Sequence, residues 1–330
     1  MGMSISAEHW AMAAGLGASA VWVVSSLAFT AASRRIGPSL VNGLRILLAV
    51  AVLWTVHAML RGTPVPGALR EQIVYLALSG MIGLAIGDQL FLVSLVELGP
   101  RIAVLVMCTA GPIFALGLGV GVMGDRLGVW DVAGIAVTIA GVAWVITERG
   151  QDEPTRVPHA EPLPPPRKRS SVGLACAIGA AFCQAAGAMC SKRGMGHGIL
   201  PPAEHMDPLG ATAWRMAWAL VFVTPIVVWS MRANRKRVHT LDTDAEARRA
   251  RIRAGVGFAV IGSIFGPCTG VWMSLVAYDG LSLGVAQTLC SLTPVMILPV
   301  VALSGRERVS ARAALGACVA VGGSAMLFLA

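Results

Sequence analysis

A single carboxylate, Asp88, stands in a stretch that is otherwise almost wholly apolar, GLAIGDQLFL. An ionisable group in such a run is costly in hydrocarbon, so it normally faces the protein interior or a water-filled path. Asp88 can take up and release a proton or bind a substrate, or it can form a fixed ion pair. Arg45 is the candidate partner, because both residues are predicted to lie roughly 9–12 Å from the same membrane face.

Uncharged polar side chains in the apolar runs are the other candidates for lining a cavity. Thr109 and Ser291 each precede a proline by three residues, and the missing proline N–H frees a backbone carbonyl nearby. Amide and hydroxyl groups need partners in hydrocarbon, and tryptophans can form aromatic walls, although they suit the membrane interface equally. The predicted substrate-binding or coupling residues are Asp88, Gln89, Thr109, Ser291, Gln287, Thr288, Gln184, Trp22, Trp272 and Arg45.

The elements that carry these residues must be membrane helices. Apolar residues make up 56% of the 330-residue chain and charged residues 13%, with a mean hydropathy of +0.72. Such a composition is far from that of a soluble domain, and backbone groups in lipid are satisfied by helices. The sequence predicts an all-α integral membrane protein with ten spans, near 10–31, 39–60, 73–96, 102–123, 129–147, 172–191, 211–231, 254–276, 281–303 and 312–329.

The chain repeats itself with an offset of 182 residues, which lays Pro112 on Pro294 and Asp125 on Glu307. We therefore predict two five-helix repeats, residues 1–147 and 171–330, joined by a Pro-rich charged linker at 148–170. Because five crossings bring the chain back from the opposite face, the second repeat is inverted. Inverted repeats are typical of transporters with a substrate site near the membrane midplane.

Basic residues are unevenly distributed among the predicted loops. Of the 26 Lys and Arg residues, 19 fall in odd-numbered loops and 5 in even-numbered loops. This bias places the odd loops in the cytoplasm and both termini outside a cell (inner) membrane. The net charge of +9 is thus explained by topology and anionic lipid, and no nucleic-acid partner is predicted. The other two of the 26 basic residues, Arg45 and Arg215, lie inside apolar runs, at corresponding places in NGLRILLA and TAWRMAWA. A long side chain there can reach the membrane interface.

Motifs for metal, redox or nucleotide chemistry are not found in the sequence. The seven cysteines lie in predicted spans without a C-x-x-C pair, and we interpret them as small packing residues. His197, Glu204, His205 and Asp207 share a loop but fit no zinc spacing. There is no G-x-x-x-x-G-K-[ST] or H-E-x-x-H motif. We expect no cofactor and no metal, and the sequence does not indicate an oligomeric state.

Each predicted repeat closes with a proline-containing helix, a turn around Gly-Asp-Arg or Gly-Arg-Glu-Arg, and a glycine-rich last helix. With the stretch GDQLFLVSLVELGPRIAVLVMCTAGPIF, this combination resembles the EamA-type permeases of the drug/metabolite transporter (DMT) superfamily. The resemblance covers almost the whole chain. It implies a secondary carrier, often an exporter, that moves a small organic metabolite and is driven by protons or by the gradient of the solute.

Two other functions stay open at this point. One is a lipid flippase, which uses the same architecture. The other is an integral membrane enzyme acting on lipids, with Asp88 as an acid or base. The inverted repeat favours a carrier over an enzyme, because alternating access uses the symmetry and a catalytic site does not need it.

Overall fold

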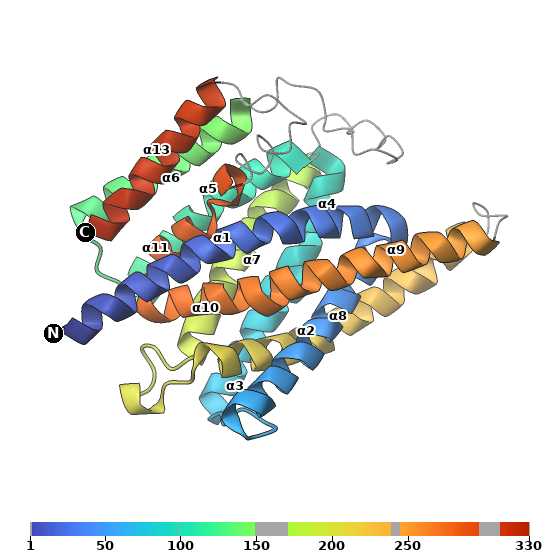
Figure 1. The fold of residues 1–330 in the computed structure, drawn as a ribbon, viewed down its shortest axis with the longest axis horizontal. Helices are drawn as coiled ribbons and strands as arrows, with labels where there is room; N and C mark the ends of the chain where they lie inside the picture. The colour runs from blue at the N-terminus through green and yellow to red at the C-terminus, as the bar shows by residue number, and fades with distance from the viewer. Residues whose placement is uncertain (1, 99, 149–170, 239–244, 297–310, 330) are drawn as a thin grey trace.

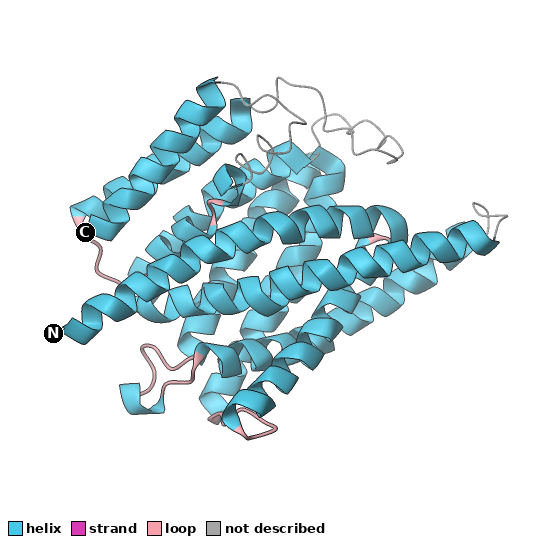
Figure 2. Cartoon of the chain, viewed as in Figure 1, coloured by secondary structure: helices cyan, strands magenta, loops and turns pink. Residues whose placement is uncertain are grey.

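The computed structural model describes residues 2–98, 100–148, 171–238, 245–296 and 311–329, and within these ranges the chain is helical and has no strand (Figures 1 and 2). Eight of the described helices are long and apolar enough to cross a membrane, and two further apolar helices, Leu283–Met296 and Ala314–Met326, are shorter. The predicted all-helical fold is confirmed. The ten apolar runs coincide with these segments, whereas a count of ten spans stays a prediction.

The helices follow one another in the same order in each half. The first half has α1 (Gly2–Ile36), α2 (Pro38–Arg61), α3 (Arg70–Ser79), the π-helical η1 (Gly80–Gly87), α4 (Asp88–Leu98), α5 (Pro100–Leu118), the π-helical η2 (Gly119–Met123) and α6 (Val129–Glu148). The second half has α7 (Ser171–Gly194), α8 (Pro208–Val238), α9 (Ala245–Ser263), the π-helical η5 (Ile264–Gly270), α10 (Val271–Gly280), α11 (Leu283–Cys290) and α13 (Ala311–Leu329). The third long helix of each half thus consists of three consecutive elements, α3–η1–α4 in the first half and α9–η5–α10 in the second, and its middle part is π-helical.

Helix packing joins the halves according to the repeat. Helix α7 packs on α3, η1 and α4, and its counterpart α1 packs on α9, η5 and α10. Three further pairs are formed by a helix and its own counterpart: α2 with α8, α5 with α11, and α6 with α13. Helices α6 and α13 lie side by side in opposite directions (Figure 1). Each half therefore buries its apolar surface against the other half, and the two form one bundle.

Glycines allow the closest of these contacts. A Cβ on Gly187 in α7 would lie 2.8 Å from Cα of Gly83 in η1, so the two backbones touch. In the counterpart pair, a Cβ on Gly266 in η5 would lie 2.3 Å from Oγ of Ser25 in α1. The approach is reinforced by hydroxyls that donate to glycine carbonyls, such as Ser79 Oγ to Gly187 O at 2.6 Å. Small residues at helix crossings are the usual basis of close packing in membranes.

The two repeat-related prolines act differently on their helices. Pro112 lies inside α5, which continues through it. In the second half, α11 ends at Cys290, two turn residues follow, and a short helical piece begins before Pro294. The backbone N–H groups of Ser291 and Leu292 bond to carbonyls three residues back, at 3.1 and 3.3 Å. Ser291 thus lies at a helix break, while its counterpart Thr109 lies in an unbroken helix.

Two predicted features fall largely outside the described residues. The linker at 148–170 lies there except for Glu148 at the end of α6. The turn around Arg306, Glu307 and Arg308 lies there entirely.

The outside of the bundle carries large exposed apolar side chains, among them Leu60, Trp130 and Trp229, as a protein surrounded by lipid requires.

Candidate functional site

An ion pair between Arg45 and Asp88 stands at the centre of the site. Asp88 is the first residue of α4, directly after η1, and its Oδ2 faces Nη2 of Arg45 from α2. The other carboxylate oxygen accepts a hydrogen bond from Nε2 of Gln184 in α7 at 2.8 Å. Arg45 also donates from Nε to Asn42 at 2.9 Å and covers the ring of Phe29. The prediction that Arg45 and Asp88 meet is confirmed.

This cluster connects the two repeats. Arg45 and Asp88 come from the first half and Gln184 from the second. Gln184 Nε2 also lies 3.3 Å from the carbonyl oxygen of Gly83, so it ties Asp88 to the π-helical segment. The side chains of Arg45 and Asp88 are only 13% and 15% exposed. A change in the charge of Asp88 would therefore be felt across the interface between the halves, with little screening by solvent.

Arg215 is related to Arg45 by the repeat, but its surroundings differ. It is only 4% exposed, so the expectation that its side chain reaches the membrane interface is wrong. Its Nε is buried without a hydrogen-bond partner, and within the described ranges its guanidinium forms no ion pair or hydrogen bond. A Cβ on Gly83 would lie 2.9 Å from Nη2 of Arg215. The guanidinium therefore lies directly over the backbone of η1.

A second polar group surrounds Gln287. Tyr278 in α10 donates from its hydroxyl to Oε1 of Gln287 at 2.7 Å. The neighbouring hydroxyls bond within their own helices: Thr288 to Gly284 O and Ser291 to Gln287 O, each at 2.8 Å. These hydroxyls are donors to carbonyls one turn earlier. They keep lone pairs that can accept a hydrogen bond from a solute.

Thr109 is placed near this group by the packing of α5 on α11. Its own hydroxyl donates to Leu105 O at 2.7 Å. A Cβ on Gly111 would lie 3.7 Å from Nε2 of Gln287, and a Cβ on Gly284 would lie 3.2 Å from Cα of Leu116. In this antiparallel register, Thr109 lies at about the level of Ser291. The geometry is compatible with the predicted common cavity, and their facing it stays a prediction.

The remaining predicted residues are more dispersed. Gln89 follows Asp88 in α4, and among the described residues its buried Oε1 has no hydrogen-bond partner. Trp22 in α1 packs against η5, where a Cβ on Gly270 would lie 3.2 Å from its Nε1. Trp272 is half-buried in α10. An apolar pocket of about 400 Å³ opens elsewhere, between α1, residues 292–296 and α13, and contains none of the predicted site residues.

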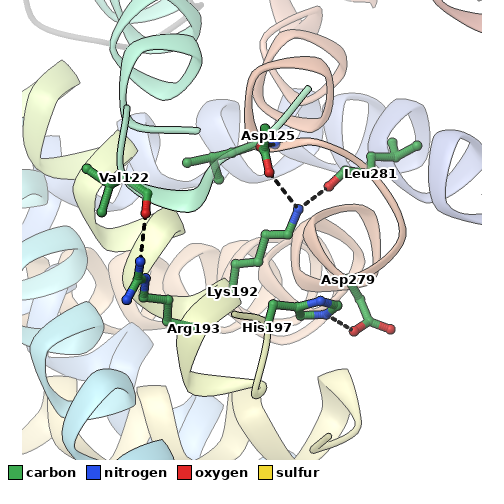
Figure 3. A network of polar contacts seen from close by, with 8 residues as sticks. Val122, Asp125, Lys192, Arg193, His197, Asp279 and Leu281 are labelled. Atoms are coloured by element: carbon green, nitrogen blue, oxygen red, sulfur yellow. Dashed lines mark hydrogen bonds and ion pairs between the residues drawn. The ribbon is translucent and has the colours of Figure 1, made fainter. Parts of the chain in front are cut away.

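A polar network at one end of the bundle was not predicted (Figure 3). Asp125, which follows η2, accepts a hydrogen bond from the backbone N–H of Leu283 at 2.8 Å and lies 4.0 Å from Nζ of Lys192. Lys192 also donates to Leu281 O at 2.5 Å. At the same end, Arg193 donates to Val122 O at 2.7 Å. We call Asp125, Lys192, Leu281 and Leu283 the Asp125 network; it ties the first repeat to the second.

Sequence reasoning found the central pair but missed Tyr278, Lys192 and the role of Asp125. Tyr278 lies near a helix end, and Lys192 was interpreted as a loop charge. A signal for Lys192 was available in the repeat. Ser33-Arg34-Arg35 lies at the end of α1 and Ser191-Lys192-Arg193 at the end of α7, so each half places a basic pair at the end of its first helix. Nothing in the sequence distinguishes Tyr278 from a core aromatic residue.

Comparisons with known proteins agree with this architecture. A model of the EamA-like transporter family matches residues 9–147 and 171–329. Among solved structures, 25 chains match. One of them, described only as "Crystal structure of protein", has a TM-score of 0.66 at 18% sequence identity and covers 97% of this chain and 99% of its own. At that identity the likeness shows the fold alone. No curated protein matches the chain.

Proposed function

The chain belongs to the EamA-like transporter family of the DMT superfamily, and from that premise we propose that it is a secondary active carrier of a small organic metabolite. Members of the family are multi-pass membrane transporters and not enzymes. The proposal adds alternating access as the mechanism, export as the direction, the cell (inner) membrane as the location and both termini outside. A proton is the proposed coupling ion. We propose repeat boundaries at residues 147 and 171.

The matched packing of the two repeats carries this proposal. Most helix pairs across the interface either have a counterpart of the same kind or join two repeat-related helices. In a carrier of this kind, exchanging the conformations of the two repeats turns a state open on one side into a state open on the other. At the crossing of α7 and η1 the backbones of Gly187 and Gly83 touch, so these two positions offer no side chain to oppose such a movement.

The Asp125 network supports the same mechanism, because it joins the two repeats at one end of the bundle. Asp125 belongs to the first repeat and holds Leu283 and Lys192 of the second. Opening this end requires these contacts to break. Buried charge-assisted hydrogen bonds are costly to break individually, so the network sets a barrier to opening.

Proton coupling is proposed for Asp88. Its carboxylate accepts from both Arg45 and Gln184, which come from opposite repeats. Protonation would remove the charge that holds Arg45 and weaken the connection between the halves. Substrate and proton can then compete for the same group, which is the requirement for coupled exchange.

A lipid flippase is the second candidate. The apolar pocket of about 400 Å³ favours it, because the pocket lies between α1 and α13 and is lined by residues such as Leu16, Leu292 and Val321. Such a lining suits an acyl chain. Transfer of a labelled phospholipid between the leaflets of reconstituted vesicles, with no counterflow of any water-soluble solute, would favour this candidate over the carrier.

A crosslink across the closed end tests the carrier. A Cβ on Gly119 would lie 3.3 Å from Cβ of Leu283, close to the typical disulfide separation of about 3.8 Å. In a variant without the seven native cysteines, Gly119→Cys with Leu283→Cys should form a disulfide that stops counterflow in vesicles, and reduction should restore it. The variant with only Gly119→Cys is the control. Full counterflow by quantitatively crosslinked protein would contradict alternating access at this end.

A further inference from the structure

The strongest unassigned feature of the bundle is the unbalanced charge of Arg215. A buried cation without a partner is expensive, and native proteins keep one mainly where a ligand or a counter-ion completes the site. The repeat provides an internal comparison. Arg45, the counterpart of Arg215, is neutralised by Asp88, whereas the stretch of the second repeat that corresponds to Asp88, FGPCTG, contains no acidic residue.

The guanidinium lies directly against the backbone of η1. A Cβ on Gly83 would lie 2.9 Å from Nη2 of Arg215, and Gly83 in turn packs on Gly187 of α7. Asp88, which directly follows η1, already accepts from Arg45 and Gln184. Tyr278 is already a hydrogen-bond donor to Gln287. The five N–H donors of the guanidinium are thus left for a planar acceptor that enters from outside.

We propose that Arg215 binds the carboxylate of a small organic acid, which is the transported solute. The proposal rests on the carrier function proposed above and specifies its substrate class. A guanidinium and a carboxylate form two parallel hydrogen bonds, so the ligand supplies the counter-charge that the second repeat lacks.

The charge balance favours a carboxylate over a phosphate. Among the described residues, Arg45 is compensated by Asp88 and Lys192 lies near Asp125, whereas the buried guanidinium of Arg215 forms no ion pair. A carboxylate of charge −1 neutralises it. A phosphate monoester carries about −1.5 to −2 at neutral pH, and the excess would lie in the bundle close to the negative charge of Asp88.

The first experiment measures thermal unfolding of the purified protein with added ligands. The probes are lactate, benzoate and phenylacetate, each paired with its neutral amide, and phenyl phosphate. At least one acid should raise the melting temperature, because a ligand that binds the folded state stabilises it. The matching amide should bind more weakly by about tenfold to a hundredfold, as expected for losing a hydrogen-bonded charge pair. Equal stabilisation by acid and amide, stronger stabilisation by phenyl phosphate, or no stabilisation by any acid overturns the proposal.

Arg215→Met and Arg45→Met form a matched pair that separates binding from folding. Arg215→Met removes an unpaired charge, so the ligand-free protein should be as stable as the wild type or more stable, and the response to acids should disappear. Arg45→Met leaves Asp88 buried without its cation and should lower the melting temperature. If Arg215→Met destabilises the ligand-free protein as much as Arg45→Met does, the guanidinium has a structural role and the proposal fails.

Transport distinguishes a failure of this inference from a failure of the carrier function. Counterflow of a carboxylate that disappears in Arg215→Met supports both. Counterflow of a neutral solute by the wild type and by Arg215→Met alike overturns the acid site and leaves the carrier standing. Acids that stabilise the wild type without any counterflow support the site at Arg215 and contradict the carrier.

Discussion

Replacing Asp88 by asparagine tests whether the central ion pair stabilises the bundle. The change keeps the shape of the side chain, but an amide has one acceptor oxygen where the carboxylate has two, one for Arg45 and one for Gln184. Removing one partner of a buried pair costs about 3–5 kcal/mol. Because the pair is about one-seventh exposed, we use the lower value, and the remaining amide bond returns about 1 kcal/mol. The expected loss in the free energy of unfolding is about 2–3 kcal/mol.

Thermal unfolding of the purified protein measures this loss. With an unfolding entropy of about 2.1 cal/mol/K per residue, the 330-residue chain should melt roughly 3–4 °C lower. Glu71→Gln, at an exposed position in the first turn of α3, is the control and should change stability by less than about 0.5 kcal/mol. The double variant Arg45→Met with Asp88→Leu should recover most of the loss, because an apolar pair replaces the ion pair.

Two results would refute this reasoning. If Asp88→Asn melts with the wild type, the ion pair contributes nothing to stability. If the loss in the free energy of unfolding of the double variant equals the sum of the losses in the two single variants, Arg45 and Asp88 are not energetically coupled. The single variant Asp88→Asn also tests the proposed coupling role. In this variant, counterflow driven by a pH gradient should disappear while exchange of solute continues. Unchanged pH dependence of transport in Asp88→Asn would rule that role out.

Three further predictions concern packing, cavity and topology. Gly187→Ala should destabilise the protein by about 1–3 kcal/mol in thermal unfolding, because its methyl group would lie 2.8 Å from a backbone atom of η1, whereas Gly257→Ala meets open space and should be neutral or stabilising. Thr109→Cys and Ser291→Cys, in a variant without native cysteines, should react with water-soluble thiol reagents, and inert thiols at both positions in folded protein would contradict a common cavity. A reporter fused after Ala330 should lie outside the cell, and a cytoplasmic signal would overturn the predicted orientation.

The features that could be predicted from the sequence are those that depend on position along a helix. Hydropathy locates the apolar runs, and the offset of 182 residues identifies the repeat. Counting residues from the helix ends placed Arg45 and Asp88 at similar depth, and the structure pairs them. Depth along the membrane normal is one coordinate, and a linear sequence supplies it directly.

The features that could not be predicted depend on which way a side chain faces. Helices such as α7 are apolar on all sides, so periodicity does not distinguish the face that meets a neighbour from the face that meets lipid. Arg215 was therefore expected to reach the interface, although it points into the bundle. The pairing of Tyr278 with Gln287 was likewise hidden, because it depends on how α10 and α11 turn toward each other. The different effects of Pro112 and Pro294 show that a repeat in sequence does not impose the same backbone on both copies.

The π-helical segment η1 sets the direction in which Asp88 points. A π-helical turn holds one residue more than an α-helical turn, and such a bulge is an insertion accommodated inside a helix. If Gly80–Gly87 became a regular α-helix of the same length, everything after it would turn by about 100° relative to α3. Asp88 would then leave Arg45 and Gln184 while every residue of the site remained present. The backbone form of this segment therefore decides the pairing of Asp88 as much as the identity of its partners does.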